Sequence, residues 1–323
     1  MHYYELEPEN NIFSNLVVDL THRCNMECSN CYIPNRHIPD LDVTKLYDVV
    51  DRLPFRTYIR LIGAEPTMRD DLADIIYNIK KRGHQTTLTT NGLKLARQEY
   101  CQKLKEAGLN LVLTSMNGAD DDEIYKILDN GKWATAKTRA LTNLFRQQFA
   151  INTGTIIARN VNEHTIMRQI QTVVNCAKEA GVDFKTTKIY RRITPVLRMK
   201  SVGSIGRNMG KNHAYALEEL AGVVAEQLNL SKEWILNHKA ASGTVIAVQK
   251  DKHYKNKTVV QEECSSLVFP YETELGKLYI RLIDWGIDDD GVVDPDNPNR
   301  GRLTPNFKIA PFYEHLKRNE FGY

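Results

Sequence analysis

Three of the six cysteines in this 323-residue chain lie within eight positions, in the stretch CNMECSNC at residues 24–31. Uneven cysteine spacing in an unsecreted chain argues against a disulfide framework and for metal or catalytic chemistry. A structural zinc site needs four protein ligands, but His22 is adjacent and the other cysteines are remote. A [4Fe–4S] cluster held by three cysteines instead leaves one iron open to a small molecule. We therefore expect Cys24, Cys28 and Cys31 to hold such a cluster.

Alternating apolar segments predict the elements that position this loop. Strands are expected at residues 15–20, 57–62, 85–89, 109–115, 150–158 and 183–189. Helices are expected after an N-cap at Asp42, from residue 70 or 71 to 83, and around residues 98–107, 134–148 and 163–180. These repeats imply an α/β fold with a parallel sheet, either doubly wound or curled into a barrel. The cysteine loop follows the first strand, and ligands bind at the carboxyl ends of such strands.

The pattern changes after about Gly210. The later elements expected are helices at 214–228 and 231–238, a hairpin of 244–249 with 257–261, a strand at 277–284 and a helix near 311–317. We therefore expect a first domain over residues 1–209 and a β-containing extension over 210–323. This extension is expected to cover the mouth of the first domain and the substrate site.

Composition narrows the function classes. Lys and Arg number 43 against 40 Asp and Glu, so a formal net charge of +3 makes no strong case for nucleic acid. The chain has no apolar run of membrane-spanning length and no signal-peptide pattern, so the cytoplasm is the expected compartment. The basic stretch 188–200 is interpreted as solvated or helix-flanking, and the acidic stretch 288–296 as a polar turn.

The C-x3-C-x2-C spacing after a first strand resembles the radical S-adenosylmethionine (radical SAM) enzymes. Further motifs follow in the same order at strand ends: GAEP at 63–66 resembles the family's GGEP, TTNG at 89–92 its TNG, and SMNG at 115–118 its S-x-D-G. The resemblance covers residues 15–207. This chain departs from the pattern at Ala64, which replaces a glycine, and at Asn30, where the family often carries an aromatic residue; Tyr32 follows the third cysteine instead.

The resemblance implies a partial (β/α)6 barrel, with a [4Fe–4S] cluster and SAM as cofactors. A flavodoxin- or ferredoxin-type protein would donate the electron that cleaves SAM to a 5′-deoxyadenosyl radical. The residues implied in SAM binding are Gly63, Ala64, Glu65, Pro66, Thr89, Thr90, Asn91, Ser115, Asn117 and Tyr32. Asn160, after the fifth strand, stands where the family often has a polar residue.

The substrate classes differ in how well they suit this chain. A small polar metabolite is favoured, with epimerisation or dehydrogenation as its reaction. Modification of a peptide is the alternative, while modification of RNA is disfavoured by the small net charge and the lack of a recognisable RNA-binding module. A metal-binding electron-transfer or interaction protein that never cleaves SAM is the alternative from a different class.

The remaining cysteines have separate interpretations. Cys101 and Cys176 fall on apolar helix faces and are expected in the core. Cys264 is the lone cysteine of the extension, too few for an auxiliary cluster. Beside the possibility of an idle thiol, we consider Cys264 as a catalytic residue that returns a hydrogen atom to a substrate radical.

Overall fold

The computed structural model describes residues 4–31, 33, 36–203, 207, 213–239, 266–283 and 300–311. The strands are β1 (Asn15–Asp19), β2 (Tyr58–Ile62), β3 (Gln85–Thr90), β4 (Leu111–Ser115), β5 (Ala150–Ile157), β6 (Val196–Ser201), β7 (Ser266–Thr273), β8 (Gly276–Ile283), β9 (Gly301–Leu303) and β10 (Ile309–Pro311). The helices are α1 (Val43–Arg52), α2 (Leu72–Lys81), α3 (Gln98–Glu106), α4 (Asp122–Asp129), α5 (Ala134–Arg146), α6 (Ile166–Glu179), α7 (Leu217–Leu228) and α8 (Lys232–Leu236).

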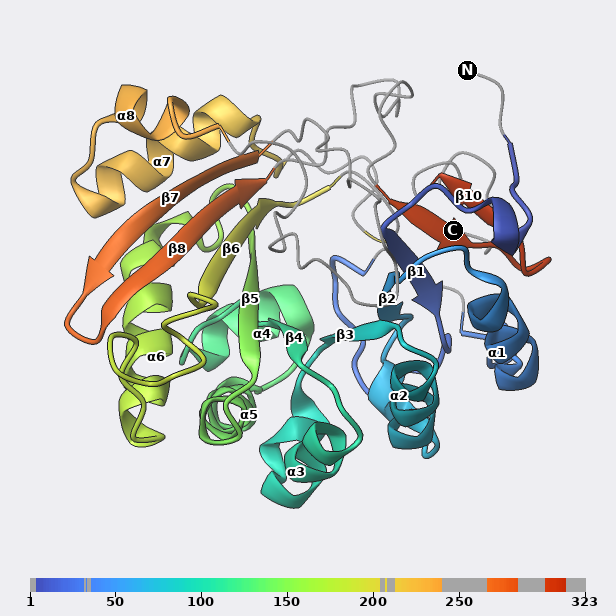
Figure 1. Ribbon diagram of the computed structural model, residues 1–323. Coiled ribbons are helices and arrows are strands. Elements are labelled where there is room, and N and C mark those ends of the chain that lie inside the picture. The colour runs from blue at the N-terminus through green and yellow to red at the C-terminus, as the bar shows by residue number, and fades with distance from the viewer. Residues whose placement is uncertain are drawn as a thin grey trace.

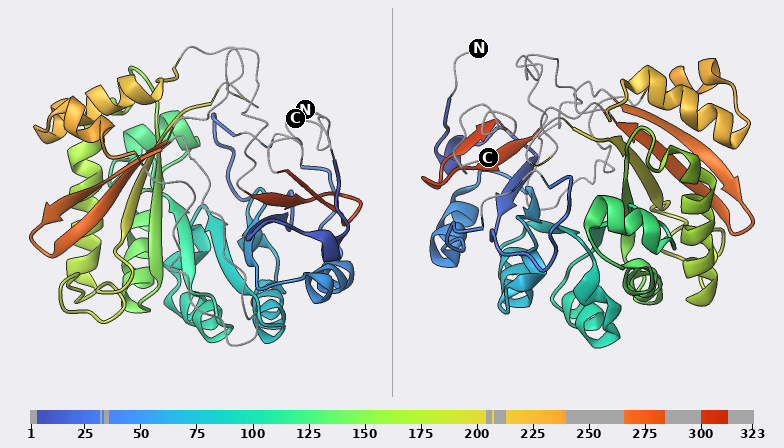
Figure 2. Two further views of the ribbon diagram at one scale, coloured as in Figure 1. Left: turned by 45° about the horizontal axis from the view of Figure 1, so that its top comes forward. Right: turned by 180° about the vertical axis from the view of Figure 1, so that it is seen from behind.

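The strands form one sheet in the order β10-β9-β1-β2-β3-β4-β5-β6-β8-β7. Strands β1 to β6 pair in parallel, in the order in which they occur in the chain. Helices α1, α2, α3, α5 and α6 lie along the outer side of the curved sheet (Figures 1 and 2). The expected partial barrel is confirmed, and the sheet does not close because β10 and β7 are its two edges. Among the described residues, no helix has the length and apolarity that crossing a bilayer requires.

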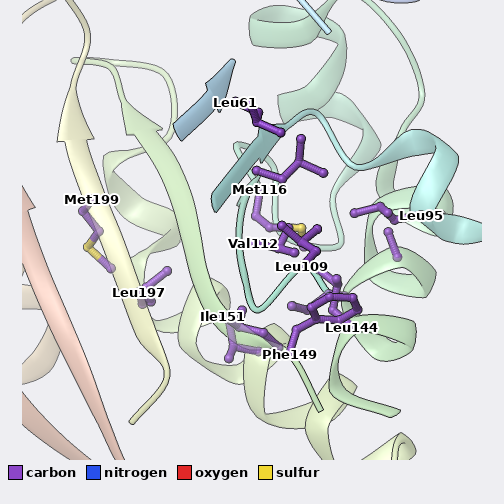
Figure 3. Close-up of a cluster of buried hydrophobic side chains, with 14 of the residues drawn as sticks. Leu61, Leu95, Leu109, Val112, Met116, Leu144, Phe149, Ile151, Leu197 and Met199 are labelled. Atoms are coloured by element: carbon purple, nitrogen blue, oxygen red, sulfur yellow. The ribbon is translucent and has the colours of Figure 1, made fainter. Parts of the chain in front are cut away.

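The outer face of the sheet forms the hydrophobic core. Alternate strand residues such as Leu61, Val112, Ile151, Leu197 and Met199 are buried in it, as Figure 3 shows. Because successive strand residues point to opposite faces, the residues between them face the inner side of the sheet. That inner face includes the charged residues Asp19, Arg198 and Arg281.

The sixth strand was predicted at residues 183–189, and this prediction is wrong: β6 lies at Val196–Ser201. Asp183 Oδ1 accepts hydrogen bonds from the Lys185 and Thr186 amides, both at 2.8 Å, so the chain turns there. The apolar residues that suggested a strand pack as an aromatic group instead: the rings of Phe184 and Tyr190 lie 5.9 and 5.7 Å from that of Phe145.

The basic stretch 188–200 divides at this strand. Arg191 and Arg192 are exposed, in agreement with a solvated stretch. The interpretation is wrong for the C-terminal half, because Arg198 and Lys200 alternate with buried Leu197 and Met199 and face the inner side of β6.

The region after Gly210 adds strands to both edges of the sheet. Strand β8 confirms the strand expected at 277–284; it pairs in parallel with β6 and antiparallel with β7. Strand β9 pairs with β1. Helices α7 and α8 confirm the two expected helices, while α4, β7, β9 and β10 were not predicted. The expected hairpin, the 288–296 turn and the closing helix beyond Pro311 lie outside the described residues.

The aromatic group at 184–190 generates a stability prediction. We expect Phe184→Ala to lower the free energy of unfolding by roughly 3–5 kcal/mol, because Phe184 is 4% exposed and its removal leaves a cavity beside Phe145. The control Ile193→Ala, at a residue 51% exposed, should change it by less than about 0.5 kcal/mol. Urea unfolding followed by circular dichroism measures both, and equal losses would contradict this packing.

Candidate functional site

The cysteine loop follows β1 and is held in place on two sides. Ser29 Oγ donates to the carbonyls of Ile127 and Leu128, at 2.6 and 2.9 Å, at the end of α4. On the other side, the Arg207 amide donates to the Cys31 carbonyl at 2.9 Å, and its guanidinium contacts the Cys28 carbonyl at 3.3 Å. Hydrogen bonds therefore hold the loop against segments that lie about 100 and 180 residues away in the sequence.

Cys24, Cys28 and Cys31 all carry free, partly accessible thiols. Burial raises the pKa of Cys24, and burial together with nearby Asp129 raises the pKa of Cys28. The charge of Cys31 raises the pKa of both Cys24 and Cys28, and the charge of Cys24 raises the pKa of Cys28, so the three thiols lie near one another. Arg36 Nη2 lies 3.3 Å from Cys31 Sγ. Cys101 and Cys176, by contrast, are buried in the core, as expected.

The donor set consists of three thiols, the ligand type that an iron–sulfur cluster takes. Within the described residues, no three His, Cys, Asp or Glu side chains surround one point as a single metal ion requires. Three neighbouring thiols on one loop suit the wider body of an iron–sulfur cluster, which thiolates bind. Their protons must leave on binding, and a metal centre drives that loss despite the raised pKa of Cys24 and Cys28.

The GAEP segment at the end of β2 packs directly on the start of the cysteine loop. Gly63 has φ = 139°, and a Cβ there would lie 2.3 Å from the Thr21 carbonyl oxygen. The Ala64 amide donates to that oxygen at 2.9 Å, and the Glu65 amide donates to the Arg23 carbonyl at 3.0 Å. Only glycine permits this close approach, whereas Ala64 contributes its backbone and tolerates a methyl group. Pro66 is buried and begins a short 3-10 helix.

The Glu65 carboxylate joins the ends of β2 and β3. It is fully buried and accepts four hydrogen bonds: from the Thr67 amide and hydroxyl at 3.0 and 2.6 Å, the Thr90 hydroxyl at 2.7 Å and the Asn91 amide at 2.6 Å. Three of these donors share Oε1 and one binds Oε2, so protein groups on both strand ends hold the carboxylate in place. Glu65 therefore acts here as a positioning residue for the segment that contains Asn91.

Asn91 connects this junction to the cysteine loop. Its Nδ2 donates to Asn25 Oδ1 at 2.8 Å and lies 3.9 Å from Cys24 Sγ. Gly92 follows with φ = 85°, where a Cβ would lie 2.7 Å from Thr114 Oγ1. Thr89, one residue before Thr90, faces the inner side of β3.

A buried ion pair that the sequence analysis missed supports the next strand end. Lys137 and Asp129 have side chains 0% and 1% exposed, and Lys137 Nζ lies 3.7 Å from Asp129 Oδ2. Lys137 Nζ also donates to the Asn91 carbonyl, the Ser115 carbonyl and Ser115 Oγ, at 3.0, 3.1 and 2.8 Å. The sequence contained one signal for this ion pair: Lys137 lies on the apolar face of α5, where Ala140, Leu141 and Leu144 are buried.

Asn117 extends this network to β5. Its Nδ2 donates to Asp129 Oδ1 at 2.7 Å, and its Oδ1 accepts from the Ile156 amide at 2.9 Å. The buried amide after β5 is Asn162, which donates to the Asn117 carbonyl at 3.2 Å, whereas Asn160 is exposed. Ser115 and Asn117 are therefore held by a charged, hydrogen-bonded network beyond what turn residues require.

Comparison with known proteins places this loop in a family. Residues 18–173 match the family described as the radical SAM superfamily. The chain carries a radical SAM domain. The matched residues include the three cysteines, the GAEP and TTNG segments, Ser115 and Asn117. Proteins of this family bind a [4Fe–4S] cluster and SAM.

Relatives match the domain over part of their length. A probable GTP 3′,8-cyclase of Methanococcus aeolicus is 32% identical over 131 residues, which are 38% of this chain and 43% of that protein. A 7,8-dihydro-6-hydroxymethylpterin dimethyltransferase of Methanocaldococcus jannaschii is 26% identical over 186 residues, 54% of this chain and 37% of that protein. The chain thus spans about half, or less, of the length of the curated relatives it matches.

A solved structure has the same fold over nearly the whole chain. Streptococcus suis SuiB superposes with a TM-score of 0.57 and 13% identity, covering 95% of this chain and 62% of SuiB. A second SuiB structure, bound to S-adenosylmethionine, has a TM-score of 0.51 and 14% identity, covering 70% of this chain and 48% of SuiB. At this identity the likeness concerns the fold alone.

The structure thus brings the three cysteines, GAEP, TTNG, Ser115 and Asn117 of the radical SAM domain to one end of the sheet. Tyr32 and Cys264 lie outside the described residues, so their roles stay predictions. Arg207, Lys137 and Asp129 are the supporting residues that sequence motifs did not reveal.

The first prediction at this site concerns Glu65. Glu65→Gln places an N–H donor among groups that all donate, so we expect it to lower the free energy of unfolding by about 1–3 kcal/mol and to weaken SAM binding as the Asn91 segment moves. Iron content should be retained. The exposed Glu99 provides the matched control Glu99→Gln, and identical unfolding curves and SAM titrations for the two variants would refute the positioning role.

The second prediction at this site concerns the buried ion pair of Lys137 and Asp129. Lys137→Met leaves Asp129 charged and unpaired, so we expect a loss of roughly 3–5 kcal/mol in unfolding free energy. Asp129→Asn preserves the acceptor for Asn117, and the double variant should lose less than the sum of the single losses. A double-mutant cycle from urea unfolding measures this coupling, and strict additivity would show that the two charges act independently.

Proposed function

We propose that this chain is an enzyme that cleaves SAM at a [4Fe–4S] cluster on Cys24, Cys28 and Cys31 and removes a hydrogen atom from a small polar metabolite. The observation that carries the proposal is the trio of neighbouring free thiols, fastened between α4 and Arg207 at the carboxyl end of β1. When bound, the cluster and SAM supply the 5′-deoxyadenosyl radical chemistry typical of the family, with the electron from a flavodoxin- or ferredoxin-type protein.

The chain's own residues orient the cofactors. The GAEP segment presents its backbone beside the cysteine loop, and Asn91 bridges β3 to Asn25 within that loop. Ser115, held by Lys137, offers a hydroxyl at the end of β4. The buried Glu65 carboxylate adds a negative charge that favours a nearby ammonium group such as that of SAM.

Two observations favour a small polar substrate. The inner face of the sheet carries polar and charged side chains, among them Asn152, Arg198 and Arg281, alongside apolar ones. The curated relatives are named for reactions of GTP and of a hydroxymethylpterin, which are small polar molecules. Epimerisation or dehydrogenation of such a metabolite is the reaction class we propose.

Cofactor loading tests the proposal. Anaerobically reconstituted full-length chain should hold about four irons and, with dithionite and SAM, release 5′-deoxyadenosine, because three thiolates leave one iron open for SAM. Replacing Cys24, Cys28 and Cys31 by Ala should abolish both the brown absorbance and the product. Iron analysis, visible absorbance and chromatography of the nucleoside measure these outcomes.

Cys101→Ala is the matched control, since Cys101 is a buried thiol whose Sγ donates to the Leu95 carbonyl at 3.4 Å. It should retain iron and nucleoside formation. Bound zinc in place of iron, or an iron-loaded protein that never consumes SAM, would overturn the proposal in favour of a metal-binding or electron-transfer protein.

A further inference from the structure

Arg198 is a charged side chain on the inner face of the sheet that the proposed cofactor site does not use. Its neighbours Leu197 and Met199 are 1% and 0% exposed in the outer core, so Arg198 points to the opposite face. The strand register places it beside Gly154 of β5 and Arg281 of β8. Figure 1 shows these strands side by side.

The absence of a side chain at Gly154 makes room for the Arg198 guanidinium. A Cβ on Gly154 would lie 2.8 Å from Arg198 Nη2, so the guanidinium extends across β5. Gly154 is in turn the register partner of Ser115, at the end of β4. Arg198 is thereby directed across β5 toward β4.

The charge on Arg198 lacks the compensation that another inner-face arginine has. Arg302 forms an ion pair with Asp19 at 2.8 Å, and both side chains are nearly fully buried. Among the described residues, no carboxylate forms an ion pair with Arg198. The buried Nε atom of Arg198 likewise has no hydrogen-bond partner among those residues. Its charged neighbours within the described part of the chain are cations: burial, Arg281 and Arg300 together lower the pKa of Arg198 to about 10.

We propose that Arg198, with Arg281 beside it, binds an oxyanion group of the substrate, a carboxylate or a phosphate, on the inner face of the sheet. A guanidinium is suited to this because its planar donors match two oxygens of such a group at once. Arg281 Nη2 donates to Ser266 Oγ at 3.2 Å, which fixes its position at the β8 side of the site.

An oxyanion group of the substrate suits the position beside Arg198 better than the carboxylate of SAM does. By the family resemblance, a cluster on the β1 loop would take the SAM carboxylate, and four strands separate β1 from β6 in the sheet. Arg198 also lies three residues before the end of β6 at Ser201, below the strand ends that hold the cysteine loop. This inference rests on the proposed function only in calling the bound anion a substrate.

Anion binding by the full-length, reconstituted protein tests the inference. Inorganic phosphate and succinate, each titrated at constant ionic strength with sodium chloride as reference, serve as the phosphate and carboxylate probes. At least one should bind saturably to the wild type by calorimetry. Arg198→Met should weaken that binding roughly tenfold or more, because a charge-assisted bidentate contact is lost, while Arg198→Lys should restore part of it.

Two controls separate recognition from structure. Arg192→Met makes the same change at an exposed arginine and should leave anion binding unchanged. Without anions, Arg198→Met should melt at the same temperature as the wild type or higher, since it removes a cation from beside Arg281 and Arg300. A clearly lower melting temperature would mean that Arg198 is a structural residue.

The remaining outcomes overturn the inference. The first is that neither anion binds saturably to the wild type. The second is that Arg198→Met binds the anion as tightly as the wild type does. The third is that Arg198→Met binds SAM more weakly while its anion affinity is unchanged. Iron content and 5′-deoxyadenosine formation in the same preparations report on the proposed function separately. If Arg198 binds the anion but the protein does not cleave SAM, the proposed function is wrong and the anion site is still supported.

Discussion

The buried Glu65 carboxylate is the interaction on which the arrangement of the site depends. It accepts hydrogen bonds from groups that follow β2 and from groups that end β3, while its own amide donates to the loop that contains Cys24. A buried carboxylate that lost these donors would be destabilised by several kcal/mol, as would the donors themselves. Three segments distant in sequence are thereby held in one geometry.

The Lys137–Asp129 pair continues this organisation to β4 and β5. Lys137 joins the carbonyls at the ends of β3 and β4, and Asp129 contacts Asn117, which joins β5. A buried ion pair is weak evidence for stability in itself, since desolvation offsets its attraction. Here the pair serves positioning, because its hydrogen bonds are made to the backbone groups that present Asn91 and Ser115.

The two faces of the sheet carry different kinds of side chain. The outer face buries aliphatic side chains against the helices, and the inner face carries Asp19, Arg198, Arg281 and Arg302. Because strand side chains alternate, a single residue slip in register would exchange the two sets. The hydrophobic core therefore also determines which charged residues face the proposed substrate.

The sequence by itself determined the α/β repeats, five of the first six strands, and the cysteine, GAEP and TTNG segments, because local periodicity and short spacings encode them. It failed where partners are distant. The apolar residues near Phe184 suggested a strand, yet they pack on Phe145 in α5, and the sixth strand was hidden among basic residues. Only the tertiary structure decided that Lys137 pairs with Asp129, that Arg207 holds the cysteine loop, and that Gly154 makes room for Arg198. Those contacts depend on which strands become neighbours, and a linear pattern of residue types does not contain that information.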